Sequence, residues 1–264
     1  MTHEAWGMVF ASVTDTGSTR SVNQDTVFAN RIAVSDYGQN PYLFLVADGM
    51  GGYSGGDVAS KLATKAFVEL FSSLASIWPE ADNSKLWLSI LADLVNQTNT
   101  KIIEAQTTTD LKLMGTTLTV AVIVENYLHL VHVGDSRLYH YDGERTYQIT
   151  RDHSLVGELL RAGQLTPEEA LHHPKRNVIT QALGVAWEIE IEAKSLELTP
   201  KSRLLLCSDG LSNMVRDEEI EAVLVNDAEP EKQVEHLCNL ANENGGRDNI
   251  SVIIARYHKG EGSE

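Results

Sequence analysis

The stretch from Thr117 to Val133, TLTVAVIVENYLHLVHV, decides the fold. Two apolar runs, Thr117–Val124 and Leu128–Val133, flank the polar pair Glu125-Asn126. Short runs rich in β-branched residues are typical of buried strands, and a two-residue polar connection is typical of a tight hairpin. The stretch therefore predicts two neighbouring antiparallel strands.

Other segments extend this pattern in both directions. Further strands are expected at Met8–Val13, Thr26–Ala33, Tyr42–Ala47, Arg137–Tyr141, Ile189–Leu196, Arg203–Cys207 and Ile250–Ala255. Apolar residues at helical spacing predict helices over Asp57–Ala75 and Ser84–Gln106, with Ser84 as the N-cap, and a third helix over about 231–242. Because strands mostly follow strands, the order favours an α+β fold of antiparallel sheets covered by helices over a parallel doubly wound sheet.

Length and composition limit the class of protein. The 264 residues, 42% of them hydrophobic, suffice for one large core, and no linker divides them, so one domain is expected. A net charge of −16 argues against nucleic-acid binding. Neither a membrane span nor a signal-type segment is evident, and Cys207 and Cys238 form no disulfide or zinc pattern. A cytoplasmic protein is expected, with a polar tail at 258–264.

Four aspartates lie at the ends of predicted strands. Asp48, Asp135 and Asp209 each follow an apolar run, and Asp248 precedes one. A single Asp-Gly pair usually marks only a turn, but a rigid sheet can hold four such carboxylates close together. Clustered carboxylates repel one another, and hard divalent cations with oxygen ligands relieve the repulsion. The set predicts a metal-dependent hydrolase.

Two loops add candidate site residues. A segment with five glycines joins a predicted strand to a helix and reads Asp48-Gly49-Met50-Gly51-Gly52-Tyr53-Ser54-Gly55-Gly56-Asp57. It lacks the Gly-Lys-Ser/Thr ending of a phosphate-binding P-loop, and the chain lacks protein-kinase motifs. Asp48 and the Gly49 carbonyl are therefore expected to bind metal. Upstream, Arg20 suits bidentate contact with a phosphate, and Asp25 supplies a further carboxylate, although a surface turn is the alternative.

Together these pieces resemble the metal-dependent protein phosphatase family PPM (type-2C), and its bacterial members in particular. Seven stretches match in the family's order: Arg20-Ser21-Val22-Asn23-Gln24-Asp25, Val46-Ala47-Asp48-Gly49-Met50-Gly51-Gly52, Met114-Gly115-Thr116-Thr117, Val133-Gly134-Asp135-Ser136-Arg137, Arg151-Asp152-His153-Ser154, Leu206-Cys207-Ser208-Asp209-Gly210-Leu211 and Gly246-Arg247-Asp248-Asn249. Each alone is weak, whereas the ordered set is specific.

The resemblance implies two packed antiparallel sheets flanked by helix pairs, an α-β-β-α sandwich. It implies one domain over 1–257 with a flap at about 157–183. It also implies two Mn²⁺ or Mg²⁺ ions per chain, and allows a third, weaker site. The implied ligand assignments are Asp48 bridging both ions, Asp209 and Asp248 on one, Asp25 and the Gly49 carbonyl on the other, and Asp135 with Asp209 on the third. Arg20 would bind the substrate phosphate, with Asp48 and Asp209 as the catalytic carboxylates, and Asn249 would support the site. For Arg137 a structural role is favoured over a functional one.

The expected reaction is hydrolysis of phosphoserine or phosphothreonine in proteins by a water that bridges two metals, without a covalent intermediate. A cysteine-nucleophile phosphatase is disfavoured, because Asn213 and Asn244 stand where its phosphate-binding arginine would follow Cys207 or Cys238. No general acid is assigned. Relatives carry a histidine at the position of Met50 or of Tyr53. A metal-bound water, or His153 if the fold brings it near, could serve instead.

The expected partners are phosphorylated proteins, the products of a bacterial Ser/Thr kinase, with no nucleic acid and no membrane. Two other functions remain open. One is a catalytically inactive relative that binds phosphoproteins, although retention of the acidic ligands argues against it. The other is a phosphatase of small phosphorylated metabolites.

Overall fold

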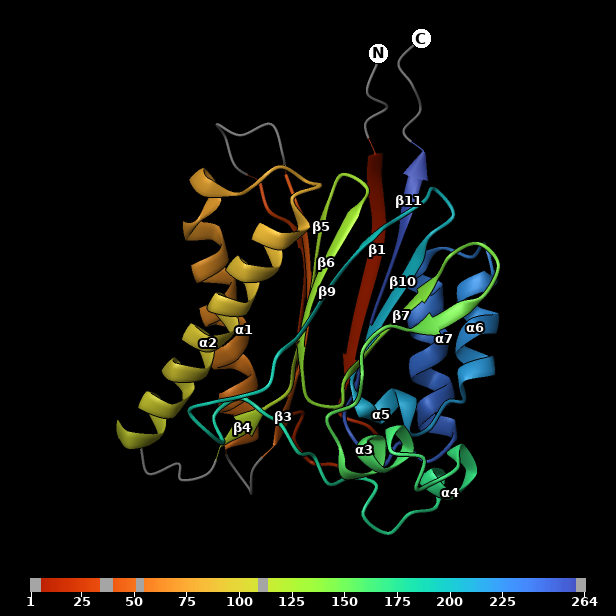
Figure 1. Cartoon of the computed structure of the whole chain (residues 1–264). Coiled ribbons are helices and arrows are strands. Elements are labelled where there is room, and N and C mark those ends of the chain that lie inside the picture. The colour runs from red at the N-terminus through yellow and green to blue at the C-terminus, as the bar shows by residue number, and fades with distance from the viewer. Residues whose placement is uncertain (1–5, 34–39, 51–54, 109–113, 260–264) are drawn as a thin grey trace.

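Two antiparallel sheets pack face to face in the computed structural model, and helices cover both outer faces (Figure 1). The structure describes residues 6–33, 40–50, 55–108 and 114–259. One sheet has the strand order β1 (Trp6–Asp15), β11 (Ile250–Lys259), β10 (Arg203–Cys207), β7 (Arg137–Tyr141) and β8 (Thr146–Gln148). The other has the order β2 (Asp25–Arg31), β3 (Tyr42–Met50), β5 (Leu118–Val124), β6 (Tyr127–Val133) and β9 (Glu192–Glu197), with β4 (Gly115–Thr116) paired to β3.

The helices form two outer layers and a group at one end. Helices α1 (Gly56–Ser73) and α2 (Ser84–Thr108), with the short η1 (Ala75–Ile77) between them, cover the sheet that contains β3. Helices α6 (Asp217–Val225) and α7 (Pro230–Glu243) lie outside the sheet that contains β10. Helices α3 (Leu155–Arg161), α4 (Pro167–Leu171) and α5 (Asp209–Ser212) lie at the end of the sandwich where β3 ends. The predicted α-β-β-α sandwich is confirmed.

The hairpin predicted at residues 117–133 forms as strands β5 and β6. Leu118 pairs with Val133 and Val124 with Tyr127, and the turn between them holds Glu125 at φ +53. Every residue of β5 is buried. A strand buried on both faces carries a continuous apolar run rather than an alternating one, which explains why this stretch is so apolar.

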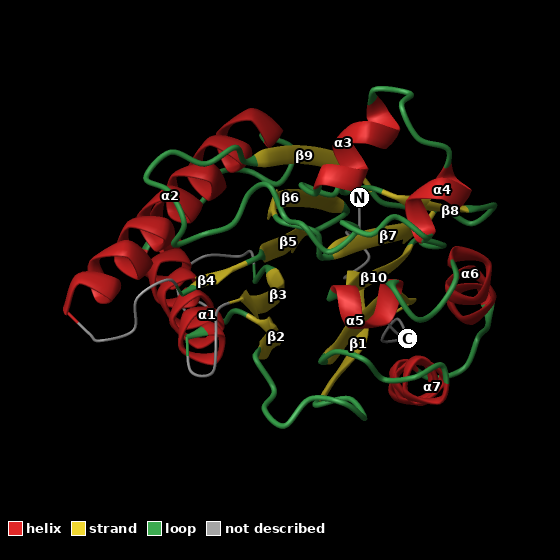
Figure 2. Cartoon of the chain, turned by 90° about the horizontal axis from the view of Figure 1, so that it is seen from below, coloured by secondary structure: helices red, strands yellow, loops and turns green. Residues whose placement is uncertain are grey.

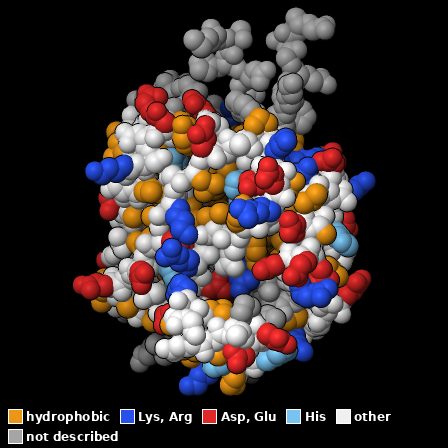
Figure 3. Space-filling model, turned by 45° about the vertical axis from the view of Figure 1, so that its right-hand side comes forward, with side chains coloured by type: hydrophobic (Ala, Val, Ile, Leu, Met, Phe, Trp, Pro, Cys, Tyr) orange, Lys and Arg blue, Asp and Glu red, His pale blue; other side chains and the backbone are white. Residues whose placement is uncertain are grey.

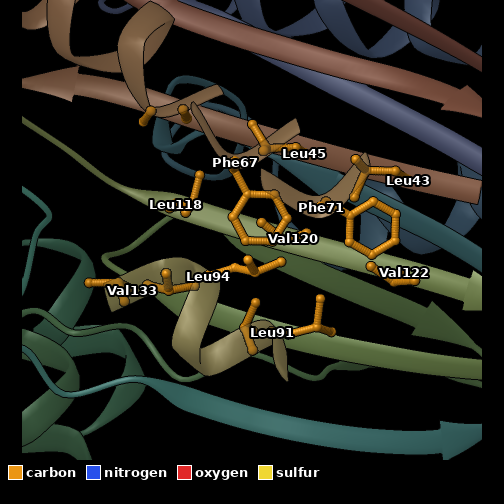
Figure 4. Packing of buried hydrophobic residues seen from close by; sticks show 14 of the residues in the cluster. Leu43, Leu45, Phe67, Phe71, Leu91, Leu94, Leu118, Val120, Val122 and Val133 are labelled. Carbon is orange, nitrogen blue, oxygen red and sulfur yellow. The ribbon is translucent and has the colours of Figure 1, made fainter. Parts of the chain in front are cut away.

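Strand β3 separates two of the three hydrophobic clusters. Leu43 and Leu45 contact the helix side and pack with Phe67, Phe71, Leu91 and Leu94, among others (Figure 4). The alternate residues Phe44 and Val46 belong to the cluster between the sheets, with Leu204, Leu206 and Ile253 from β10 and β11. This period of two fixes the register, because a slip of one residue would exchange the two faces. The end of β3, which carries Asp48, is thereby held in place.

Several predicted boundaries differ from the observed ones. The N-cap of α2 is Asn83 rather than Ser84, since the Asn83 side-chain oxygen accepts a hydrogen bond from the Leu86 backbone N–H at 3.3 Å. The strand expected from Ile189 begins at Glu192, and the strand expected to reach Ala33 ends at Arg31. Strand β11 includes His258 and Lys259, so it extends two residues into the expected tail. The remaining tail residues, 260–264, lie outside the described part of the chain.

Across the described residues, the helices are all too short or too polar to cross a membrane. Figure 3 shows acidic and basic side chains interspersed over one face of the molecule.

Candidate active site

The sheet registers bring the predicted acidic residues to one end of the sandwich, the end seen in Figure 2. Asp25 at the start of β2 pairs directly with Asp48 near the end of β3. Asp209 begins α5, just after β10, and Asp248 precedes β11. Strands β10 and β11 are neighbours and both contact β3 across the sandwich. Four segments distant in sequence therefore meet.

Burial and mutual repulsion perturb three of these carboxyl groups. Burial, with added repulsion from Asp209 and Asp248, raises the pKa of Asp25 to about 7. Burial raises the pKa of Asp48 well above its ordinary value, with Asp25 and Asp209 as the next causes. Burial and the charge of Asp248 raise the pKa of Asp209 to about 6. The fold thus places several carboxyl groups where ionisation is unfavourable. Clusters of such perturbed pKa values are typical of functional sites.

Two buried carboxylate oxygens are candidate ligands for a cation. Asp25 accepts a 2.7 Å hydrogen bond from the Ser208 hydroxyl at one oxygen, and its other oxygen is buried with no hydrogen-bond partner in the described part of the chain. One oxygen of Asp135, which is 7% exposed, is likewise buried and unpartnered among the described residues. Buried carboxylate oxygens without donors are suitable ligands for Mg²⁺ or Mn²⁺.

Asn249 fastens the loop that carries Arg20 and Asp25. Its side-chain oxygen accepts from the Gln24 N–H at 2.8 Å, and its side-chain nitrogen donates to the carbonyls of Thr16 and Val22 at 2.9 and 3.0 Å. Asn249 therefore supports the site, as the resemblance implied. Arg20 itself is half exposed and donates to Asp248 at 2.7 Å. Its guanidinium thus lies at the edge of the acidic cluster.

Thr116 and Thr117, which belong to one of the family-matching stretches but were assigned no role there, hold the Asp48 backbone. The Asp48 N–H donates to the Thr117 hydroxyl at 3.0 Å, and the Asp48 carbonyl accepts from the Thr117 N–H at 2.8 Å and the Thr116 hydroxyl at 2.9 Å. The Thr117 hydroxyl also shares a 2.8 Å hydrogen bond with the Ser136 hydroxyl, next to Asp135. This bridge links the turns that carry two of the predicted ligands.

His153 holds the turn before Asp135. Its N–H donates to the Gly134 carbonyl at 2.7 Å, and its ring Nδ1 accepts from the Gly134 N–H at 3.2 Å. Burial lowers the pKa of His153, so the ring is neutral near pH 7. These contacts give His153 a positioning role for the Gly134–Asp135 turn rather than that of a proton donor. Of the two positions where relatives carry a histidine, Met50 ends β3 and Tyr53 lies outside the described residues.

His153 also belongs to a second cluster, with His132 and Glu192, whose possible ligand atoms lie within 4.8 Å of one another. Glu192 already has a cation partner, since Lys194 Nζ lies 2.7 Å from one of its oxygens, and the Arg151 N–H donates to the other at 2.7 Å. Both ring nitrogens of His132 are hydrogen-bonded, to Thr119 and to Gly134. The hydrogen bonds and the ion pair already made by His132 and Glu192 argue against a metal site at this cluster.

Arg137 also makes structural contacts. It donates to both carboxylate oxygens of Asp152, with distances of 2.8 to 3.2 Å, and to the Tyr139 hydroxyl at 3.0 Å. A bidentate pair of this kind fixes the guanidinium in one orientation. These contacts agree with the structural role expected for Arg137.

Replacing Asp25 by asparagine is expected to stabilise the metal-free protein more at pH 8 than at pH 5. Because the folded-state pKa of Asp25 is raised from 3.8 to about 7, this group favours folding at low pH and loses that contribution as pH rises between the two values. Asparagine has no group that ionises in this range, so the variant does not lose this contribution to stability as pH rises. Thermal unfolding in chelator should give a gain in Tm at least about 3 °C larger at pH 8. An equal gain at both pH values would show that Asp25 does not titrate in this range.

The fold and the site define a class of protein, a hydrolase with clustered carboxylates at one end of a two-sheet sandwich. Comparison with known proteins agrees with this class. Residues 17–251 match the family model described as Protein phosphatase 2C, so the chain belongs to the protein phosphatase 2C family. This confirms the family expected from the sequence motifs.

Individual relatives resemble nearly the whole chain. The protein phosphatase PhpP of Streptococcus pneumoniae is 37% identical over 259 residues, covering 96% of this chain and 98% of that protein. The crystal structure of the Mycobacterium tuberculosis serine/threonine phosphatase PstP/Ppp has a TM-score of 0.81 and 38% identity, covering 94% of this chain and 98% of that one. A structure of the PstP catalytic domain, described as a complex with two manganese ions, has a TM-score of 0.79 and 36% identity, covering 96% of this chain and 99% of that one.

Proposed function

We propose that this chain is a metal-dependent phosphatase of phosphoserine and phosphothreonine in proteins. The observation that carries the proposal is the convergence of Asp25, Asp48, Asp209 and Asp248 at one end of the sandwich. The pKa values of Asp25, Asp48 and Asp209 are raised there, and one buried oxygen of Asp25 has no partner among the described residues. Family membership supports the same reading.

Two divalent cations fit this donor set. Asp48 would contact both; Asp209 and Asp248 would hold one; Asp25 and the Gly49 carbonyl would hold the other. Asp135 with Asp209 offers a third, weaker site. The two manganese ions described for the PstP relative favour Mn²⁺, and oxygen ligands also accept Mg²⁺. Bound at these residues, such ions would supply an activated water and would offset the charge of the phosphate oxygens.

The chain's own residues restrict the mechanism. Burial raises the pKa of the Cys207 thiol to about 12 and that of Cys238 to about 11, so neither supplies a thiolate nucleophile near neutral pH. Asn249 and Thr117 hold the segments that carry Asp25 and Asp48. Arg20, at the rim, can donate two parallel hydrogen bonds to a phosphate group. Direct hydrolysis without a covalent intermediate is therefore favoured.

Arg20→Ala is expected to lower kcat/KM for a phosphothreonine peptide by about 10- to 100-fold, since a charge-assisted hydrogen bond contributes about 1.5–3 kcal/mol. Arg20→Lys should give an intermediate loss because lysine keeps the charge without the planar fork. Steady-state kinetics provide the measurement. Arg216→Ala, which removes an exposed arginine paired with Glu219, is the control and should change little. If Arg20→Ala left kcat/KM unchanged, the role of Arg20 would be limited to its ion pair with Asp248.

The proposed partners are proteins phosphorylated by a bacterial Ser/Thr kinase in the cytoplasm. We further propose that residues 1–257 form one phosphatase domain, in which the segment 157–183 acts as a flap over the substrate. Within this segment the structure contains the end of α3 and all of α4. Both helices lie at the same end of the sandwich as the acidic cluster (Figure 2).

The test of substrate class compares a phosphothreonine peptide with sugar phosphates under identical Mn²⁺ concentrations. The peptide is expected to have a kcat/KM at least about tenfold higher. Faster hydrolysis of the sugar phosphates would assign a metabolite phosphatase. Peptide binding without turnover would assign an inactive phosphoprotein-binding relative.

A further inference from the structure

Residues Leu183–Trp187, which we name the strap, are fastened tightly beside the active site. The Leu183 N–H and carbonyl pair with Thr116 of β4 at 2.9 and 3.1 Å. The buried Asn99 of α2 accepts from the Gly184 N–H at 2.7 Å and donates to the carbonyls of Ala186 and Trp187 at 2.8 and 3.3 Å. The strap backbone is therefore fixed by both β4 and α2.

A second α2 side chain adds to this anchoring. Gln106 Nε2 donates to the Gly184 carbonyl at 2.6 Å and to the Met114 carbonyl at 3.1 Å. Gly184 adopts φ +84, and a Cβ there would lie 2.6 Å from a methyl group of Ile102, so only glycine fits between the strap and α2. The strap conformation is thus specified by the fold.

This fixed backbone presents large apolar side chains to solvent. Val185 is 66% exposed and Trp187 is 65% exposed. Two residues apart, their Cα atoms lie within about 7 Å of each other, so the two side chains can form one surface. A rigidly held, exposed tryptophan is unusual, and exposed apolar patches mark interaction sites. Because the backbone is already ordered, binding at this surface has a reduced entropic cost.

The strap surface is continuous with the end of β3 that carries Asp48. A Cβ built on Gly115 would lie 3.1 Å from a Val185 methyl group and 3.3 Å from the Met50 Cγ, so Val185 and Met50 both lie against Gly115. Gly115 pairs with Met50, two residues after Asp48. On the other edge of β3, Asp48 pairs with Asp25 of β2, which follows the loop of Arg20. The acidic cluster therefore has a charged flank and an apolar flank.

We propose that Val185 and Trp187, extended by Met50, bind an apolar side chain adjacent to the phosphorylated residue of protein substrates. This rests on the proposed function and adds a specificity determinant to it. In this proposal the phosphate is held near Arg20 and the acidic cluster, and the neighbouring peptide residue extends toward the opposite flank. Contact with an apolar residue there removes the exposed valine and tryptophan surface from water. A polar residue gains no such burial.

The test uses the double variant Val185→Ser/Trp187→Ser of the whole chain, loaded with Mn²⁺. Two phosphothreonine peptides differ only in carrying leucine or serine on both sides of the phosphothreonine, and p-nitrophenyl phosphate serves as a substrate without flanking residues. The native chain is expected to prefer the leucine peptide about tenfold in kcat/KM. The double variant should lose this preference and hydrolyse p-nitrophenyl phosphate within about twofold of the native rate.

Val225→Ser is the matched control, because Val225 is 44% exposed at the end of α6. It should keep the leucine preference. A native chain that hydrolyses p-nitrophenyl phosphate but shows no preference, or a double variant that retains it, would overturn the proposal. A native dimer that the double variant converts to monomer would assign the strap to self-association instead. Absence of turnover on every substrate would contradict the proposed function itself.

Discussion

Asp48→Asn is expected to abolish phosphatase activity while making the metal-free protein more stable. Asp48 is the carboxylate at the centre of the cluster, and burial together with Asp25 and Asp209 raises its pKa well above the ordinary value. The neutral amide removes this repulsion, but it is a poor ligand for a hard cation. Loss of several kcal/mol of metal-derived transition-state stabilisation corresponds to a fall in kcat/KM of at least about 10³-fold.

Two measurements on the same variant check this trade-off. Phosphate release in Mn²⁺ should fall to background, and thermal unfolding in chelator should show Tm raised by about 2–6 °C. Asp93→Asn, at an exposed position of α2, is the control and should change neither quantity. Lower stability of metal-free Asp48→Asn would contradict the picture of repelling carboxylates, and retained activity would remove Asp48 from the catalytic site.

Gly49→Ala is expected to damage both the fold and the site, although it adds one methyl group. A Cβ at Gly49 would lie 2.1 Å from the Gly56 carbonyl oxygen and 2.6 Å from the Gln24 carbonyl oxygen. Both obstacles are backbone atoms, so α1 or the loop before Asp25 must move. Overpacking of this kind costs about 1–3 kcal/mol or more. Displacement of the Gly49 carbonyl should also reduce Mn²⁺ affinity and turnover at least about tenfold.

Urea unfolding and Mn²⁺ titration calorimetry measure these two losses. Gly163→Ala is a suitable comparison, since no heavy atom lies within 4 Å of a Cβ there, although φ +66 adds local strain of about 1 kcal/mol. We expect Gly163→Ala to bind Mn²⁺ as the native chain does. Equal stability and equal Mn²⁺ affinity in the two alanine variants would show that the close contact between Gly49 of β3 and Gly56 of α1 tolerates a side chain.

Local sequence patterns predicted the parts of the fold that depend on neighbouring residues. The β5–β6 hairpin follows from two apolar runs and a two-residue turn, and α1 and α2 follow from helical spacing. Two missed helices, α5 and α6, are short. Helix α5 has four residues, and the first turn of α6 is wholly acidic, so neither shows an apolar repeat long enough to detect.

The sequence predicted which acidic residues belong to the site but not the hydrogen bonds that hold them in place. Strand ends identified Asp48, Asp135, Asp209 and Asp248 as a possible set, but their approach depends on pairing between distant strands, which only the family resemblance supplied. The hydroxyls of Thr117, Ser136 and Ser208 lie within stretches that match the family, but the match assigned them no role. Their roles follow from hydrogen bonds to Asp48, to each other and to Asp25.

The most direct test of the central claim is phosphate release from a phosphothreonine peptide, with Mn²⁺ and with chelator, for the native chain and Asp209→Asn. Asp209 follows β10 and its pKa is raised to about 6 by burial and Asp248, so it belongs to the cluster without being part of the β2–β3 pair. The account predicts turnover that requires Mn²⁺ and collapses in the variant. Turnover that persists in chelator, or that Asp209→Asn leaves unchanged, would contradict it.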